Sequence, residues 1–485
     1  MPSWGVPQAH RVITVVSERS SAVPQTCPRI PMTEAGPKKR LNPKRTPIRE
    51  VDPGERRGAF IEAVLPYTPE EAIEEAQRCI QCGKPWCMEA CPIGQDPRGY
   101  IKLLAHGDFT GARDLILRDN PLATCLGTVC YHYCERVCPV AKKGDPIAVR
   151  HLKRAALMYA GPATPYQPAT PSNGQKVAVI GGGPAGLMNA WILGQRGYEV
   201  TVFEATDRLG GLMTQTIPAY RLTDDSFAQD MARFANLPVR FHFHSSFPDD
   251  IDIDGLLKEY DAVFIGLGTH KSKRLGIPGE DLDGVIPALK YLKESKRGER
   301  ASIRPRVVVI GGGDVAMDSA RTALRHGAEE VTILYRRSRE EMPADDQEIK
   351  EAMDEGVKFQ FLVAPKRFLG VKRLEGIELQ QMILGPPDES GRRKPIPADA
   401  EPIMMRCDAA ITAVSQEADL EGVPPDLGLK VGKDGVLEAD PMSGATARPG
   451  VYAGGGASVV HAMAAGKRAA FAMDAYMMKK RNRAP

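Results

Sequence analysis

Eight cysteines between positions 79 and 138 constrain this chain more than any other feature. They form two groups of four, Cys79-x2-Cys82-x4-Cys87-x3-Cys91-Pro92 and Cys125-x4-Cys130-x3-Cys134-x3-Cys138-Pro139. Two sets of four thiolates at such short spacings are suited to two [4Fe–4S] clusters. Runs that end in Cys-Pro can also exchange their last ligand, so that it binds the cluster of the other run.

Zinc and disulfides are the alternatives for these cysteines. Structural zinc usually combines two short Cys-x2-Cys pairs, and only Cys79 and Cys82 have that spacing here. Disulfides need an oxidising compartment, and we expect a cytoplasmic protein because no secretory signal is visible. Iron–sulfur clusters are therefore favoured over zinc, and disulfides are favoured least. Cys27 and Cys407, outside the two groups, are expected to be free thiols.

Composition bounds the remaining possibilities. The 485 residues are enough for two or three domains, and a formal net charge of +3 indicates no nucleic-acid or membrane partner. No apolar run approaches the length of a membrane span. Residues 1–45 are expected to be a disordered tail or an over-long start, with Met32 as the initiator.

Residues 46–160 are expected to form an all-α domain that carries both cysteine groups. Thr68, followed by Pro69 and by Glu71 three residues after the cap, predicts the start of a helix that leads to Cys79. Apolar periodicity predicts helices over 97–118 and about 146–158. Residues 161–175 are rich in Pro, Thr and Ser and are predicted to be a linker.

A dinucleotide fingerprint follows the linker. Lys176–Ile180 is a predicted parallel strand, Gly181–Gly186 matches GxGxxG, and a helix is predicted to about Arg196. A second strand, 199–203, ends at Glu204. The glycines allow the pyrophosphate to approach the helix N-terminus, and the acid accepts hydrogen bonds from a ribose hydroxyl.

The same pattern recurs at Arg306–Ile310, followed by a glycine loop at 311–316, a helix to His326 and a strand at 330–334. Arg336 and Arg337 stand where NAD-binding units have an acid. Arginines at this position suit the 2′-phosphate of NADP, although a solvated basic face is the alternative and NADH is possible.

The expected fold class is therefore α/β with an N-terminal all-α iron–sulfur domain and two Rossmann-like dinucleotide-binding domains, the second inserted in the first. We expect the FAD-binding domain at 176–295 and 405–485 and the NADPH-binding domain at 296–404. Residues 405–415 are predicted to return to the first sheet as a strand. A closing strand within 449–455 and a last helix over about 458–480 would follow.

Several longer motifs extend the pattern: GGGPAGL (181–187), GGLMTQTIPAYRL (210–222), LGIPGED (275–281), GGGDVAMD (311–318) and YRRSREEMPA (335–344). With the cysteine runs, they resemble the glutamate synthase small (β) subunit family. Its relatives include the NADPH-binding subunit of bifurcating ferredoxin:NADP oxidoreductases, sulfide dehydrogenase and the N-terminal part of dihydropyrimidine dehydrogenase. The resemblance implies FAD, NADPH and two [4Fe–4S] clusters, with the flavin between hydride donor and clusters.

The resemblance also implies site residues. One cluster would be held by Cys79, Cys82, Cys87 and Cys138, and the other by Cys91, Cys130 and Cys134. Several relatives complete the second site with Glu or Gln where this chain has Lys153, so Cys125 is expected to complete it here. FAD would be held by Gly181, Gly183, Pro184, Ala185, Gly186, Glu204, Gly211, Leu212, Gly268 and Gly455. NADPH would be held by Gly311, Gly313, Asp314, Val315, Ala316, Arg336 and Arg337.

Two departures from the family pattern concern the flavin. Thr216 replaces a usual glycine, and about four residues are missing after Gly455, among them the Asp that normally binds the flavin ribityl chain. We still expect FAD, held less firmly than in relatives. A scaffold whose flavin site has decayed is the non-enzymatic alternative.

The expected function is an electron-transfer subunit for a larger redox partner, such as the glutamate synthase large subunit. The alternative is a subunit that exchanges electrons with ferredoxin, within a 2-oxoacid oxidoreductase or a bifurcating complex. No catalytic side chain is required, because the cofactors carry the chemistry.

Overall fold

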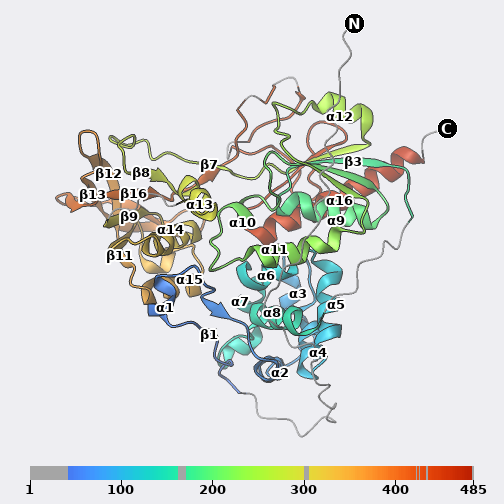
Figure 1. Ribbon diagram of the computed structural model, residues 1–485, viewed down its shortest axis with the longest axis horizontal. Coiled ribbons are helices and arrows are strands. Elements are labelled where there is room, and N and C mark those ends of the chain that lie inside the picture. Colours follow the sequence, from blue (N-terminus) through green and yellow to red (C-terminus); the bar gives the residue numbers. More distant parts are fainter. Residues whose placement is uncertain are drawn as a thin grey trace.

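The computed structural model describes residues 42–161, 171–299, 305–421, 423–424, 427–432 and 435–482. It consists of a helical domain and two units built on parallel sheets, which lie side by side above that domain (Figure 1). Most of the expected N-terminal tail, with Met32 and Cys27, and the central part of the predicted linker lie outside the described residues.

The helical domain carries the cysteines in short helices and the loops between them. Its elements are β1 (Arg49–Glu50), α1 (Pro53–Arg57), β2 (Val64–Leu65), α2 (Pro69–Gln77), α3 (Trp86–Glu89), α4 (Pro97–Ala105), α5 (Phe109–Asp119), α6 (Ala123–Val129), α7 (Tyr133–Arg136), η1 (Pro139–Lys142) and α8 (Val149–Tyr159). The predicted start of α2 is confirmed as a capping box. The Thr68 hydroxyl accepts from the Glu71 backbone N–H at 3.2 Å, and the Glu71 carboxylate accepts from the Thr68 N–H at 2.7 Å.

The helical structure predicted over 97–118 is confirmed, and two helices occupy this range. Gly107 has a φ of +77° and ends the first helix, and the carboxylate of Asp108 caps the second by accepting from the Gly111 N–H at 2.8 Å. The apolar period continues across this break, because α4 and α5 pack into the same core.

The first sheet has five parallel strands in the order β18-β6-β3-β4-β5. These are β3 (Lys176–Ile180), β4 (Glu199–Phe203), β5 (Val239–His242), β6 (Ala262–Ile265) and β18 (Val451–Ala453). Helices α9 (Pro184–Gln195) and α16 (Val459–Arg481) pack against each other beside it. The unit also contains α10 (Leu212–Gln215), α11 (Asp224–Met231), η2 (Ala232–Phe234) and α12 (Ile253–Glu259). The predicted first strand, glycine loop, helix, second strand, closing strand and last helix are confirmed.

The second sheet also has five parallel strands, in the order β11-β10-β9-β16-β8. Its strands are β8 (Val285–Pro287), β9 (Arg306–Ile310), β10 (Glu330–Tyr335), β11 (Lys358–Phe361) and β16 (Ala409–Thr412). Its helices are α13 (Ala288–Lys296), α14 (Asp314–Arg325), η3 (Arg339–Glu341) and α15 (Asp346–Asp354). All of these elements lie in sequence between β6 and β18, so the predicted insertion of the second unit in the first is confirmed.

The strand predicted over 405–415 is wrong in its placement. Two strands occupy this range, and β16 pairs with β9 and β8 in the second sheet instead of returning to the first. Because β8 also lies in the second sheet, the inserted unit extends from Val285 to Thr412, beyond both expected boundaries. A short apolar strand fits either parallel sheet, so its pattern did not decide between them.

Two further sheets complete the inserted unit and its attachment. An antiparallel sheet, not predicted, is formed by β12 (Val363–Leu369), β13 (Gly376–Pro387), β14 (Arg393–Pro397) and β15 (Ile403–Arg406). The two crossings between the units form a two-stranded antiparallel ladder of β7 (Lys271–Ser272) and β17 (Gln416–Glu417). Both connections between the units therefore lie together.

An apolar joint connects the helical domain to the first unit. Ile93, Leu122, Leu126 and Val129 belong to the same buried core as side chains of α9, α11–η2 and α16. In addition, the Lys467 ammonium of α16 donates to the carbonyl oxygen of Ile93 at 2.7 Å. This joint fixes the cysteine loops against the first unit.

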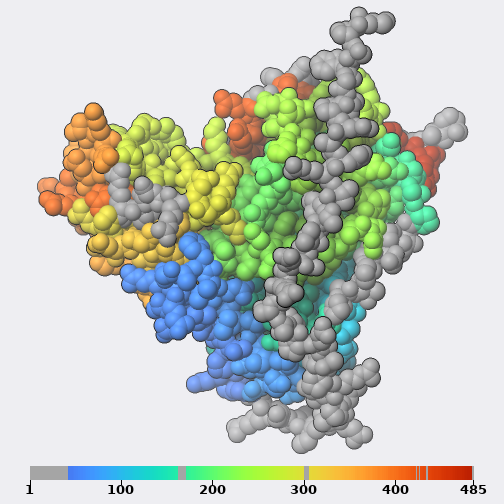
Figure 2. Space-filling model, in the orientation of Figure 1, coloured from blue at the N-terminus to red at the C-terminus, as the bar shows by residue number. Residues whose placement is uncertain are grey.

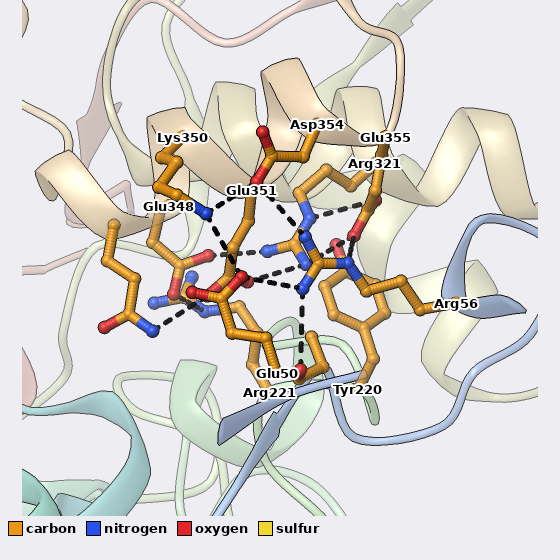
Figure 3. A network of polar contacts seen from close by, with 12 residues as sticks. Glu50, Arg56, Tyr220, Arg221, Arg321, Glu348, Lys350, Glu351, Asp354 and Glu355 are labelled. Carbon is orange, nitrogen blue, oxygen red and sulfur yellow. Dashed lines mark hydrogen bonds and ion pairs between the residues drawn. The ribbon is translucent and has the colours of Figure 1, made fainter. Parts of the chain in front are cut away.

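An ionic joint connects the second unit to the other two (Figure 3). Arg56 of α1 and Glu355 are both fully buried and lie 3.1 Å apart (Nε–Oε1). Arg321 pairs with three carboxylates of the same unit, Glu348, Glu351 and Glu355, at 2.7–2.8 Å. From the first unit, Arg221 pairs with Glu348 at 2.9 Å, and the Tyr220 ring lies 3.9 Å from the guanidinium of Arg325. Figure 2 shows the N-terminal segment (blue) beside the second unit (yellow to orange) and beside the first unit (green).

Candidate functional site

The first cysteine group lies at the core of the helical domain, against which Cys79 and Cys138 pack. Burial, and then the nearby thiols of Cys87, Cys138 and Cys82, raise the pKa of the Cys79 thiol to about 11. The amide side chain of Gln81 donates to the Cys79 sulfur at 3.4 Å, and Gln81 has a positive φ of 50°. Four adjacent thiols with N–H groups directed at sulfur are what a [4Fe–4S] cluster requires.

The second group contains three of the expected thiols. Burial raises the pKa of the Cys91 thiol; the backbone N–H groups of Gln95 and Ile93 and the ammonium group of Lys153 oppose that shift, and Cys130 adds to it. Cys134 has the thiols of Cys130 and Cys91 and the same ammonium group as neighbours. Cys91, Cys130 and Cys134 are therefore together, with Lys153 beside them.

The structure does not place Cys125 with this group, so the expectation that it completes the second site is not supported. Cys125 is fully buried on α6, and its backbone N–H donates to the Asp230 carboxylate at 2.9 Å. Burial raises the pKa of its thiol well above the usual range, and the charge of Asp230 and its hydrogen bond with the thiol raise it further. The Cys125 thiol therefore contacts Asp230 of α11 and not the cysteine loops.

The two groups adjoin one another. The thiols of Cys134, Cys91, Cys130 and Cys87 all surround the phenol of Tyr100, which is fully buried on α4. Among the described residues, no three His, Cys, Asp or Glu side chains are placed to hold a single metal ion.

A cavity of about 560 Å³ lies at the carboxyl ends of the first sheet. Nine of the ten residues expected to hold FAD line it: Gly181, Gly183, Pro184, Ala185, Glu204, Gly211, Leu212, Gly268 and Gly455. The tenth, Gly186, has a packing role, because a Cβ there would meet the Gly181 carbonyl oxygen at 2.0 Å. Helix α9 begins at Gly183 without a side-chain cap, which leaves its first N–H groups for a pyrophosphate.

Glu204 is held in place for a ribose. One carboxylate oxygen accepts from the Gly182 N–H at 2.9 Å, and the other accepts from the N–H and hydroxyl of Thr206 at 3.0 and 2.8 Å. Gly181 has a φ of +100°, and a Cβ there would meet the Gly266 carbonyl oxygen at 2.4 Å. The loop therefore requires glycine at this position and is fixed by the acid that ends β4.

A second cavity, of about 1130 Å³, lies at the carboxyl ends of the second sheet. It is lined by six of the seven residues expected to hold NADPH: Gly311, Gly313, Asp314, Val315, Arg336 and Arg337. Ala316 is buried behind them. Burial raises the pKa of Asp314, whose carboxylate accepts from the Asp345 N–H at 2.9 Å.

The two arginines after β10 differ in their surroundings. Arg336 is exposed, whereas Arg337 is buried and donates to the Arg393 carbonyl oxygen at 2.7 Å and to the Asp388 carboxylate at 2.5 Å. Arg337 is thus already engaged by the β13–β14 hairpin. Arg392 of the same hairpin also lines the cavity. Its position far along the chain gave no sequence signal.

The two cavities meet at a shared wall. Both are lined by Tyr131, Gly268, Asp314, Val315 and the 454–457 segment. Val129 and Tyr131, which flank Cys130, also line the first cavity. Tyr131 was not predicted as a site residue, because its place beside Cys130 does not reveal the cavity on its other side.

Comparisons with known proteins agree with this arrangement. Residues 56–162 match the family model "dihydropyrimidine dehydrogenase domain II, 4Fe-4S cluster", residues 179–230 an NAD(P)-binding Rossmann-like domain, and residues 243–475 a pyridine nucleotide-disulphide oxidoreductase. The glutamate synthase [NADPH] small chain of Escherichia coli is 33% identical over 472 residues, which cover 89% of this chain and 96% of that protein. The chain belongs to the glutamate synthase small-chain family.

The family extends beyond glutamate synthase itself. The NADP(+)-dependent formate dehydrogenase subunit beta of Moorella thermoacetica is 40% identical over 423 residues, or 81% of this chain, and the chain spans 60% of that subunit. The structure of Mycobacterium tuberculosis FprA in complex with NADPH has a TM-score of 0.54 at 19% identity, covering 64% of this chain and 85% of FprA. That likeness supports the fold of the two dinucleotide units.

The matched domain models support [4Fe–4S] clusters, FAD and NADP(H) as the cofactors of this chain. Several of its relatives are themselves named small or beta subunits. In the described part of the chain, no helix is long and apolar enough to cross a bilayer.

The segment that departs from the glutamate synthase small-chain pattern lies in the first cavity. Gly454–Ser458 lines it, and Ser458 caps α16, its hydroxyl accepting from the His461 N–H at 3.4 Å. The N-terminus of α16 thus faces the cavity directly after the glycines. The first turn of α16 contains no acidic side chain, so no carboxylate of that turn neutralises the positive end of the helix.

Proposed function

We propose that this chain is an electron-transfer subunit that moves electrons between NADPH and a larger redox partner through FAD and two [4Fe–4S] clusters. When bound, FAD exchanges a two-electron hydride with nicotinamide and single electrons with clusters. The observation that carries the proposal is the shared wall: Tyr131 borders both cavities and follows Cys130 directly in the chain.

The chain's own residues supply orientation and enclosure. Glu204 and the uncapped start of α9 would fix FAD, and the loop at Gly311–Gly313 would fix the pyrophosphate of NADPH. Gly268 and Gly455 form the wall without side chains, so a nicotinamide ring can approach the flavin closely. No side chain of this chain is assigned a proton-transfer role.

The partner has two candidates. Overall likeness to the glutamate synthase small chain over almost its whole length supports the glutamate synthase large subunit as partner. The higher identity to a formate dehydrogenase beta subunit supports a second candidate, a subunit that serves another redox enzyme or ferredoxin. In both cases, electrons would leave or enter through the first cysteine group, because Cys91 and Cys130 of the second group pack against the core shared with the first unit.

The test is anaerobic reduction of the purified holoprotein by NADPH, with flavin and cluster absorbance followed separately. We expect flavin bleaching first, cluster bleaching after it, and reduction of an artificial one-electron acceptor. We expect no glutamate from glutamine and 2-oxoglutarate without a partner. Bleaching of the flavin with clusters that stay oxidised, although an acceptor is reduced, would contradict the proposed route.

Identification of the partner requires a separate experiment. Affinity purification from the native source, followed by mass spectrometry, should recover a larger redox subunit. Glutamate synthesis after addition of that subunit would support the first candidate. Reduction of ferredoxin or conversion of formate would support the second.

A further inference from the structure

The second cysteine site contains three thiols and a lysine. Cys91, Cys130 and Cys134 lie together, and Lys153 of α8 lies within electrostatic range of Cys91 and Cys134. Lys153 is 4% exposed. The family-based expectation places the last ligand of this cluster at the position of Lys153, but an ammonium group cannot serve as an ordinary iron ligand.

Cys125 is not available to replace that ligand. Its thiol and its backbone N–H are both bonded to Asp230, which also accepts from the Thr124 N–H at 3.0 Å and pairs with Arg233 at 2.7 Å. Cys125 and Asp230 are fully buried, and Thr124 and Arg233 are half-buried beside them. To reach the cysteine loops, the thiol would have to leave the apolar joint and break this network.

The burial of Lys153 has a physical reason if a cluster is present. A buried ammonium group is costly unless a negative partner accompanies it. A cluster with its thiolates is anionic, and its potential depends on nearby charge. The positive side chain is therefore placed where it compensates the cluster rather than where it binds iron.

We propose that the second site is a three-thiolate site, in which Cys91, Cys130 and Cys134 each bind one iron and Lys153 faces the fourth iron without binding it. That iron has no thiolate from the chain and is exchangeable. Removal of one electron by ferricyanide then converts [4Fe–4S]²⁺ to [3Fe–4S]⁺ and free Fe²⁺, with ferricyanide reduced to ferrocyanide. This inference does not depend on the identity of the partner.

The test uses the anaerobically purified holoprotein. Ferricyanide at one equivalent per chain, with an Fe²⁺ chelator as reporter, should release one iron and lower the content from about eight to about seven per chain. An EPR signal of a three-iron cluster, about one spin per chain, should appear. Added Fe²⁺ and a reductant should restore the original state. Release of no iron, or of about four, would overturn the proposal.

Two variants assign the released iron. Cys125→Ala should keep about eight irons and release one, like the wild type, because Cys125 is not a ligand; loss of about four irons in this variant would show that it is. Lys153→Glu supplies a carboxylate where relatives have one and should retain all irons and give no three-iron EPR signal. If that variant still releases one iron, the labile iron lies elsewhere.

The Lys153→Glu change could also prevent folding, because it reverses a buried charge. Lys153→Gln is the second variant, since an amide is the other ligand type that relatives use at this position. It should suppress iron release in the same way. Circular dichroism and flavin content, unchanged from the wild type, would show that a retained iron reflects ligation and not altered packing.

Discussion

The two joints of this molecule are built from opposite chemistry. The apolar joint, between the helical domain and the first unit, is part of one continuous hydrophobic core. The ionic joint, which attaches the second unit, is a network of buried arginines and carboxylates centred on Arg321 and Glu355. Apolar packing is non-directional, whereas a buried ion network tolerates only one arrangement of its partners.

The difference matches what each joint must do. The first cavity shares the Val129–Tyr131 loop with the cysteines, so any slippage there would alter the distance from flavin to cluster. The second unit has only to deliver a nicotinamide ring in one orientation. We therefore expect that damage to the apolar joint lowers the cofactor content. Damage to the ionic joint should instead slow hydride transfer from NADPH to the flavin.

The largest expected effect comes from breaking the ionic joint. Arg56→Met removes one of the cations that pair with the buried Glu355 carboxylate. Removal of one partner of a buried ion pair lowers the free energy of unfolding by about 3–5 kcal/mol. We expect an earlier unfolding transition of the second unit in urea and slower flavin reduction by NADPH. Iron and FAD content should be unchanged. Arg57→Met, at an exposed neighbouring position, is the control and should have almost no effect.

The next effect comes from the apolar joint. Leu126 is fully buried, and Leu126→Ala should cost about 2–5 kcal/mol through lost burial and a residual cavity. Here we expect FAD and the second cluster to be lost together on gel filtration, with NADPH affinity retained. Met158→Ala, at a residue 49% exposed on α8, is the matched control. Loss of NADPH affinity with intact cofactors would contradict the division between the joints.

A smaller effect is expected within the first unit alone. Glu204→Gln removes a charged acceptor that fixes the glycine loop and would bind the ribose, a loss of about 1.5–3 kcal/mol. FAD affinity should fall about 10- to 100-fold in equilibrium titrations of the deflavinated protein. NADPH binding should not change, because Glu204 does not line the second cavity.

The smallest effect concerns nucleotide choice in the second unit. Arg336→Gln should weaken NADPH about tenfold and leave NADH unchanged, since only NADPH has the 2′-phosphate. The exposure of Arg336 limits the size of the effect. Arg337→Gln should instead lower stability without changing the NADPH-to-NADH ratio of KM values. Equal effects of Arg336→Gln on both nucleotides would identify this arginine as a solvated residue.

The local parts of the fold were predictable from the sequence. β3, α9 and β4 follow one another in the chain, and their glycines and terminal acid report the structure of a single βαβ unit. The same is true of the capping box at Thr68. These features depend only on residues a few positions apart in the chain, so a short sequence pattern is enough to predict them.

The parts that depend on distant contacts were not predictable. Cys125 contacts Asp230, 105 positions later, and Arg337 contacts Asp388. β16 pairs in the second sheet, although its pattern fits either parallel sheet. These contacts join residues far apart in the chain, so no local pattern reveals them.

The β7–β17 ladder has a consequence for the modularity of the chain. Ser272 and Gln416 are directly paired across it, so the ends of the inserted segment emerge side by side. A two-residue hairpin turn could therefore replace the whole segment between Ser272 and Gln416, and the rest of the backbone would keep its positions. The second unit is thus an inserted domain whose two ends are adjacent. Another domain with closely spaced ends could be inserted at the same position in the chain.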